Sequence, residues 1–260
     1  MFSHNPMSKK TKLKSRCTFA GLSVLLLSFL AAPAFGQESN CGSLQNGYGP
    51  YDYRTNKGET LDRVERYHFT PEVEALIKGT SGYLGGDLDY TLRAFPNNHR
   101  ALMAAMRYGE KTKSSKPPNM NYTVDCYFIR ALQFKPDDTT ARLLYATFLA
   151  KNGRQPEAIQ HTDIAETYAK DNPFTHYNVG LVYFDLKQYD KSLAQAHIAE
   201  ELGFPETGLR QQLQAAGQWK DAPPRAAAAP AAPASDAPAP AAPVAPAAQA
   251  ASAPVAPASK

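Results

Sequence analysis

Small and apolar residues recur in the middle of the chain with a period of about 34 residues. In residues 173–205 they form two groups, each spaced as on one face of a helix. The groups are Val179, Gly180 and Tyr183, followed by Ser192, Ala196 and Ala199. One period upstream the same positions hold Tyr145, Ala146, Leu149, Ala158, Thr162 and Ala165. Small residues let two antiparallel helices approach closely and larger ones fill the space between them, so the pattern predicts paired helices in tandem and an all-α chain.

Prolines mark several helix starts. Pro156, Pro173 and Pro205 each stand in a first turn, where an amide donor has no partner within the helix. Pro71 opens another helix, which Gly79 ends. The pattern as a whole predicts helices at residues 71–78, 86–95, 98–110, 120–134, 138–151, 155–169, 173–186, 189–202 and 205–217.

These repeated positions resemble those of the tetratricopeptide repeat (TPR) family, over roughly residues 86–206. A third copy lies upstream, with an insertion at Lys111–Asn119 of about six residues beyond the family spacing. The resemblance implies a short TPR-type helical solenoid of about three repeats. A last helix would cap it, with Leu209 and Leu213 facing inward and Trp219 closing the end.

The N-terminus has the features of a secretory signal peptide. Five basic and no acidic residues precede the apolar run 19–32, and small residues follow it. The expected organisation is a signal peptide at 1–36, an irregular segment with a short helix at 37–85, the TPR-like domain at 86–219 and a tail at 220–260. We therefore expect a periplasmic or secreted protein that is not stably inserted in a membrane after the signal is removed.

Removal of the signal peptide changes the charge and the cysteine count. Taking its five basic residues from the 28 of the whole chain leaves 23 against 24 acidic ones, so a nucleic-acid partner is not expected. Cys17 leaves as well, and Cys41 and Cys126 remain. An even number of cysteines in an oxidising compartment predicts that these two form a disulfide, the alternative being two separate thiols.

The C-terminal tail is rich in alanine and proline. More than three quarters of the sequence from Ala222 to Lys260 consists of these two residue types, with 20 Ala and 10 Pro. With almost no large apolar side chain it cannot repay the entropy of folding, so we expect it to be disordered and extended. Such a spacer would bring the protein close to a cell wall, tether a partner or simply keep the domain soluble.

The resemblance also implies where a protein or peptide partner would bind. TPR proteins commonly bind partners in the concave groove lined by the first helix of each repeat. The corresponding positions are Tyr177, Asn178, Leu181, Phe184 and Asp185 in the last repeat, Leu143, Leu144, Thr147 and Lys151 in its neighbour, and Met103 and Arg107 in the first. Either these residues contact a partner, or they are ordinary packing positions, or the chain's own N-terminal segment fills the groove.

Residues 41–70 show turn signals and no sustained period, so irregular structure is expected there. Within them, Tyr51, Asp52, Tyr53 and Arg54, with the charged and aromatic stretch 63–68, form the densest aromatic and charged sequence. Aromatic rings beside Asp and Arg suit a glycan or small-ligand pocket. They also suit a strap that anchors itself on a helical surface, which is the interpretation we prefer.

Catalysis finds little support in the sequence. The histidines after residue 36 form no HExxH or Cys/His pattern, and no Gly-x-Ser-x-Gly elbow is present. We therefore expect no catalytic residues, no metal site and no cofactor. The preferred function is an exported TPR scaffold or adaptor. The alternatives are a glycan or small-ligand-binding protein or weak hydrolase centred on residues 51–54 and 63–68, and a structural wall-associated protein that works through its tail.

Overall fold

The computed structural model describes residues 41–205 and 207–221, and all regular structure in this part of the chain is helical. The expected signal peptide at 1–36 and the tail from residue 222 lie outside the described residues. By its internal contacts the chain divides between Ser43 and Leu44, and the architecture below is that of the second part. The helices are α1 (Glu59–His68), α2 (Pro71–Glu74), α3 (Leu84–Ala94), α4 (His99–Thr112), α5 (Val124–Phe134), α6 (Thr139–Lys151), α7 (Gln155–Thr167), α8 (Pro173–Asp185), α9 (Tyr189–Glu201) and α10 (Gly208–Ala215). Among these helices, none is long and apolar enough to cross a membrane.

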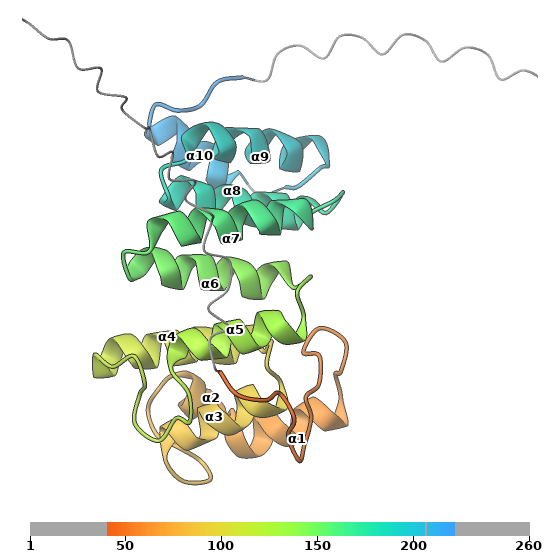
Figure 1. Ribbon diagram of the computed structural model, residues 1–260. Helices are drawn as coiled ribbons and strands as arrows, with labels where there is room; N and C mark the ends of the chain where they lie inside the picture. The colour runs from red at the N-terminus through yellow and green to blue at the C-terminus, as the bar shows by residue number, and fades with distance from the viewer. Residues whose placement is uncertain (1–40, 206, 222–260) are drawn as a thin grey trace, which may run out of the picture. The chain divides into compact units, whose positions relative to one another are not determined.

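The predicted helix pairs are present and they repeat. Among the described helices, the most extensive contacts are between α6 and α7 and between α8 and α9. Helices α8 and α9 each begin and end one sequence period after α6 and α7. Figure 1 shows the four helices stacked in this order. The structure is thus repeat-like, as the sequence pattern predicts.

Burial follows the same period. Small residues predicted at the contacts between helices are buried: Ala158 and Ala165 of α7 and Ser192 and Ala199 of α9 are at most 1% exposed, and Ala196 is 4% exposed. Gly180 shows why a small residue is needed, because a Cβ built there would lie 2.4 Å from Cδ2 of Leu209 in α10. Close approach of the helices therefore depends on these positions.

One capping device opens three alternate helices. The side chains of Asn98, Asp138 and Asn172 each accept a hydrogen bond of 3.0 Å from the backbone amide three residues later, at the starts of α4, α6 and α8. Such a cap satisfies an amide that has no partner within the helix. We call α4, α6 and α8 the first helices.

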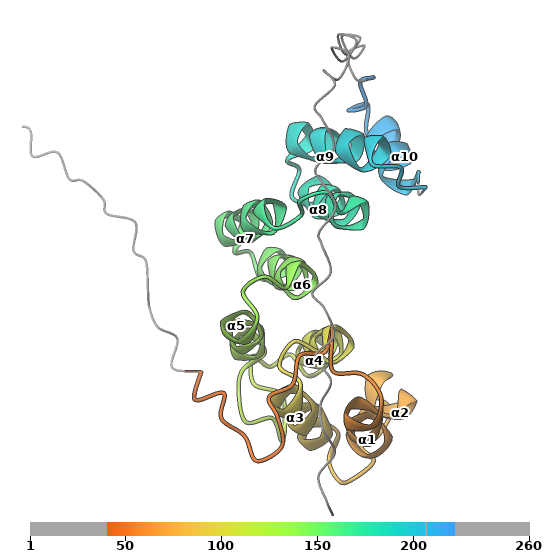
Figure 2. The same ribbon diagram turned by 90° about the vertical axis from the view of Figure 1, so that its right-hand side faces the viewer.

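The first helices form one layer. Helix α6 packs against α4 and α8, and α8 also packs against α10. In Figure 2, α5 and α7 lie to the left of α4, α6 and α8. The side chains of α4 and α6 therefore share a face with those of α8 that α5 and α7 do not cover.

The expectation of irregular structure throughout residues 41–70 is wrong, because α1 is a ten-residue helix. Its Leu61 and Val64 are buried with Ala94 and Phe95 at the end of α3. Only these two positions of α1 are buried, too few to reveal a helical period among so many polar residues. Helix α1 packs against α3, and α2 packs against α3 and α4, so this segment belongs to the helical stack.

The helix predicted at 71–78 is also shorter than expected, ending at Glu74. Leu76 adopts a left-handed conformation, with φ 59°, and its side chain is 7% exposed in the main core. Left-handed backbone is unfavourable for leucine by about 1 kcal/mol, and burying the side chain offsets this cost. The core contact therefore turns the chain before Gly79.

The remaining boundaries differ by a few residues. Helix α5 begins at Val124 and not at residue 120, because Thr123 caps it through a 3.2 Å bond from the amide of Cys126. The predicted insertion forms the link between α4 and α5.

The predicted cap is also present at the C-terminal end. Leu209 and Leu213 of α10 are buried, and the guanidinium of Arg210 lies 4.1 Å from the centroid of the Trp219 ring.

Candidate functional site

A hollow of about 240 Å³ lies between α6 and α8 on the face of the first helices. Helix α6 contributes Leu143, Leu144 and Thr147, and α8 contributes Asn178 and Leu181, all of which the sequence placed in the groove. The other lining residues are Thr140, Phe174 and Val182. We call this the α6–α8 hollow.

The α6–α8 hollow is lined without charge. The hydroxyl of Thr147 donates to the carbonyl of Leu143, and the amide of Asn178 donates to the carbonyl of Phe174, at 3.0 and 2.7 Å. Each side chain thus donates a hydrogen bond within its own helix, and its oxygen can still accept a hydrogen bond at the rim of the hollow. A neutral apolar surface of this kind suits an apolar side chain with a few polar contacts around it.

Phe174 gives the hollow an aromatic wall, since its side chain is 56% exposed. Its ring lies 6.2 Å from that of Phe204, which lies 4.6 Å from the ring of Tyr177. Tyr177 is therefore turned toward the start of α10, where a Cβ on Gly208 would lie 2.7 Å from its hydroxyl. The sequence placed Tyr177 in the groove, and the structure places it beside the hollow.

Other predicted groove residues make contacts outside the α6–α8 hollow. The Phe184 ring packs on Tyr189 with centroids 5.5 Å apart, and Asp185 is exposed at the end of α8. Lys151 pairs with Glu110 at 2.8 Å.

At the α4 end of the same layer, Arg107 donates to the carbonyl of Glu74 at 3.1 Å, and Met103 is exposed. The structure thus brings together the central predicted residues and disperses those at the ends.

A second hollow, of about 300 Å³, lies between the ends of α4 and α6. Its walls include the apolar side chains of Met106, Val124 and Phe148 and the charged residues Glu110 and Lys113. Since α6 lines both hollows, they lie along one layer of helices.

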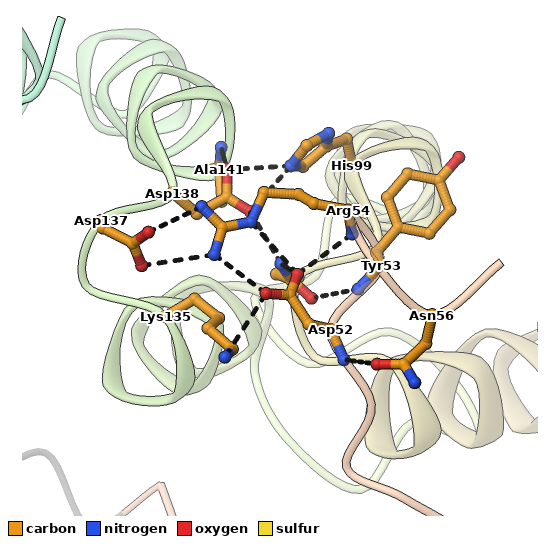
Figure 3. A network of polar contacts seen from close by, with 10 residues as sticks. Asp52, Tyr53, Arg54, Asn56, His99, Lys135, Asp137, Asp138 and Ala141 are labelled. Carbon is orange, nitrogen blue, oxygen red and sulfur yellow. Dashed lines mark hydrogen bonds and ion pairs between the residues drawn. The ribbon is translucent and has the colours of Figure 1, made fainter. Parts of the chain in front are cut away.

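Residues 52–54 make their contacts within the chain (Figure 3). Asp52 is 6% exposed, and its carboxylate accepts hydrogen bonds from Arg54 at 2.9 Å and from Asn97 at 2.7 Å. Lys135 lies 3.4 Å from the same carboxylate. The opposite face of Arg54 bonds Asp137 at 2.9 Å.

Asp138 joins this network to the first helices (Figure 3). Its side chain is 1% exposed, caps α6, and accepts from Asn97 at 2.7 Å and from Nε2 of His99 at 2.9 Å. Arg54 adds an ion pair at 3.6 Å. One carboxylate therefore connects the N-terminal segment, the α3–α4 turn and the start of α6.

Electrostatics keep these buried acids ionised. Burial alone would raise the pKa of Asp138, but hydrogen bonds from His99, the Ala141 amide and Asn97 outweigh it and hold the pKa below its usual range. The pKa of Asp52 is likewise held far below normal, because bonds from Arg54 and Asn97 outweigh burial.

The tyrosines of this segment are anchors as well. The backbone amide of Tyr51 donates to the carbonyl of Ala94 at 2.8 Å, and its ring lies 5.5 Å from that of Phe95. Tyr53 packs edge-on against His99, with centroids 5.4 Å apart. Each side chain thus holds the segment on the helices.

Most histidines of the described residues have internal partners. His68 bonds Asp87 and His176 bonds Gln195, at 2.9 and 2.7 Å. Burial and the nearby Arg142 charge lower the pKa of His161 to about 4, so it is neutral near pH 7. Within residues 41–205 and 207–221, His, Cys, Asp and Glu form no cluster that could hold a metal ion.

Sequence reasoning missed part of each site. Phe174, Asn178 and Leu181 are spaced i, i+4 and i+7 on α8, a pattern that could have identified Phe174 as a wall of the hollow. The pairing of Arg54 with Asp137 joins residues far apart in the chain, and no local signal marks it.

Cys41 and Cys126 are both disulfide-bonded, which confirms the expected bond. Neither the models of protein families nor the curated proteins compared with this chain gave a match.

Proposed function

We propose that this chain is an exported scaffold or adaptor of the tetratricopeptide repeat type, which binds an extended segment of a protein partner in a groove along its first helices. In this role the chain catalyses no covalent reaction and acts by holding its partner. The carrying observation is the neutral α6–α8 hollow on the uncovered layer of a repeating helical structure.

The repeat supports the TPR assignment. Helix bounds recur at the period of the sequence pattern, buried small residues recur with them, and an Asn or Asp caps each first helix. A stack of this kind leaves one face of its first helices for binding.

The lining of the hollow indicates the partner's chemistry. An apolar side chain would enter between Leu144 and Leu181, against Phe174. The Asn178 amide at the rim suits a backbone carbonyl or amide of the bound segment. Charged side chains of the partner would lie beyond the hollow, near Lys151 and Asp185, which are exposed.

Two observations support export. Residues 1–36 have the basic start, apolar run and small residues of a signal peptide. The disulfide between Cys41 and Cys126 suits an oxidising compartment such as the periplasm.

We assign residues 51–54 to a strap, in preference to a ligand site. The Asp52 carboxylate has its acceptor capacity filled by Arg54, Asn97 and Lys135, and Arg54 is held by Asp137 on its other side. A glycan would have to displace these charge-assisted bonds before reaching either group.

Site-specific crosslinking tests the proposed function. Phe174 is replaced by the photoreactive p-benzoylphenylalanine in the cell, and crosslinked proteins are identified by mass spectrometry. Tyr168 is the matched control, because it is 41% exposed and lies at the end of α7, outside the layer of the first helices. We expect a partner at position 174 and not at 168.

A second test of the groove assignment introduces charge into the hollow. Thr147→Glu with Asn178→Glu puts two carboxylates into a neutral hollow and should reduce crosslinking at least about tenfold, since burying unpaired charge is costly. Thr167→Glu, on the exposed end of α7, should leave it unchanged. Equal crosslinking at 174 and 168, or full crosslinking in the double variant, would refute the groove assignment.

A further inference from the structure

The tail contains a short motif that the chain repeats. Ala-Pro-Val-Ala-Pro occurs at residues 242–246 and again at 253–257. Val244 and Val255, at the centres of these copies, are the only branched apolar side chains in residues 222–260. The tail therefore offers two identical apolar anchors in an otherwise Ala/Pro-rich sequence.

The motif has the spacing of a polyproline ligand. In a polyproline II helix, residues three apart lie on the same edge, so in that conformation Pro243 and Pro246 would form one ridge with Val244 beside it. Proline ridges of this kind dock into grooves that are lined by aromatic side chains, with little loss of backbone entropy.

The α6–α8 hollow matches such a ligand in charge and in surface. No charged residue lines it, and Phe174 supplies an exposed aromatic wall beside Leu144 and Leu181. The tail from 222 to 260 is nearly neutral too, since its charged residues are Arg225, Asp236 and Lys260. Both copies of the motif lie between Asp236 and Lys260, and neither contains a charged residue.

The tail is long enough to reach the hollow. The described chain ends at Asp221, next to Trp219, whose ring packs on Arg210 of α10. Helix α10 is a direct neighbour of α8, which forms one wall of the hollow. The stretch between Asp221 and Ala242 spans about 60 Å when extended, and neighbouring helix axes are only about 10 Å apart.

We propose that the Ala-Pro-Val-Ala-Pro segments of the chain's own tail dock in the α6–α8 hollow, with Val244 or Val255 as the inserted side chain. This inference rests on the proposed function, since it assigns an internal occupant to the same hollow. A tethered ligand is present at an effective concentration of about 1 mM, so a site with a dissociation constant of about 1 mM is about half filled. An external partner then binds against competition and shows about half its intrinsic affinity.

Crosslinking of the purified full chain tests the proposal. With p-benzoylphenylalanine at Phe174, irradiation should join position 174 to a peptide within residues 239–260. Val244→Asp with Val255→Asp should reduce this product at least about tenfold. Ala228→Asp with Ala234→Asp adds the same charge outside the motifs and should leave the yield unchanged.

A second measurement keeps the native Phe174. Methyl signals of Leu144 and Leu181 should shift in the NMR spectrum of the full chain when both valines are replaced by Asp, and should stay in place for the alanine control pair. Crosslinking in a mixture of isotope-labelled and unlabelled chains identifies the source of the tail. Products that join labelled to unlabelled chains would show that the tail docks in a second copy of the chain, which would refute docking within one chain.

The two proposals fail separately. If position 174 captures a partner in cells while the purified chain gives no tail product and no methyl shift, the docked tail is refuted and the adaptor function stands. If the tail product forms and the double valine variant raises capture of the partner about twofold, the inference is supported. If the yield of the tail product is the same in the native chain and in the double valine variant, the inference is refuted.

Discussion

Asp138 is the carboxylate on which the N-terminal segment and the first helices converge, so its charge should matter more than that of its neighbour. The change Asp138→Asn keeps the shape of the side chain and one oxygen to cap α6. It removes the charge and replaces the other oxygen with an NH2 group, at a position that is 1% exposed. Nearby, Asn97 and His99 both donate to the carboxylate.

The expected cost follows from these contacts. The variant keeps one side-chain oxygen, which also accepts from the Ala141 amide at 3.0 Å, so at least one of the two donors, Asn97 or His99, faces the new NH2 group. A hydrogen bond to a charged group is worth about 1.5–3 kcal/mol, and we expect Asp138→Asn to lower the free energy of unfolding by about 2–3 kcal/mol. Asp138→Ala also removes the cap and should cost about 1 kcal/mol more.

Urea unfolding at pH 7, followed by circular dichroism at 222 nm, measures both changes, with equal slopes as evidence for a shared unfolding transition. Asp137→Asn is the matched control, because Asp137 also bonds Arg54 but its side chain is 57% exposed. Exposed ion pairs contribute little, so this variant should cost less than about 1 kcal/mol. Equal costs for the two Asn variants, or a cost below about 0.5 kcal/mol for Asp138→Asn, would refute the argument from burial.

Two further predictions concern the interior of the repeats. His161 has a pKa of about 4 in the folded chain and an ordinary pKa of 6.5 in the unfolded chain, so the unfolded chain takes up this proton first as the pH falls. The contribution of neutral His161 to the free energy of unfolding is complete above pH 6.5. It should decrease by up to about 3 kcal/mol between pH 6.5 and 4. Urea unfolding across this range should show a shallower pH dependence in His161→Gln, and an unchanged slope would contradict the assignment. Gly180→Val should lower the free energy of unfolding by about 2 kcal/mol, because the new side chain would push α10 away from α8. This movement should expose Trp219 to water and shift the fluorescence of Trp219 to the red. Gly86→Val, on a helical glycine with no atom within 4 Å of an added Cβ, is the control, and equal costs at both sites would show that contact with α10 is not the cause.

Much of the fold could be predicted from the sequence, because small residues at a fixed spacing indicate where paired helices approach each other closely. Gly180 and its counterpart Ala146 are both buried, as the period required. Helix starts were predictable too, since Asn98 and Asn172 cap by local bonds to amides three residues on. The hollow followed in part, through Thr147, Asn178 and Leu181.

The N-terminal segment could not be predicted in the same way. Helix α1 is stabilised by burying Leu61 and Val64 on the end of α3, and α2 ends where Leu76 enters the core. Both outcomes depend on surfaces supplied by other helices, whose contribution overrides the local pattern.

The repeat, the helix pairs and the disulfide pair could all be predicted from the sequence, because periodic packing depends on the spacing of small residues and only two cysteines remain after the signal peptide. Only the tertiary structure decided that Asp52 and Arg54 face Asn97 and Asp137, and that Tyr177 turns toward α10 while Phe174 lines the hollow. The physical reason is that a buried charge network and a hollow between two helices are made by side chains from distant segments. Their positions exist only once the helices have packed.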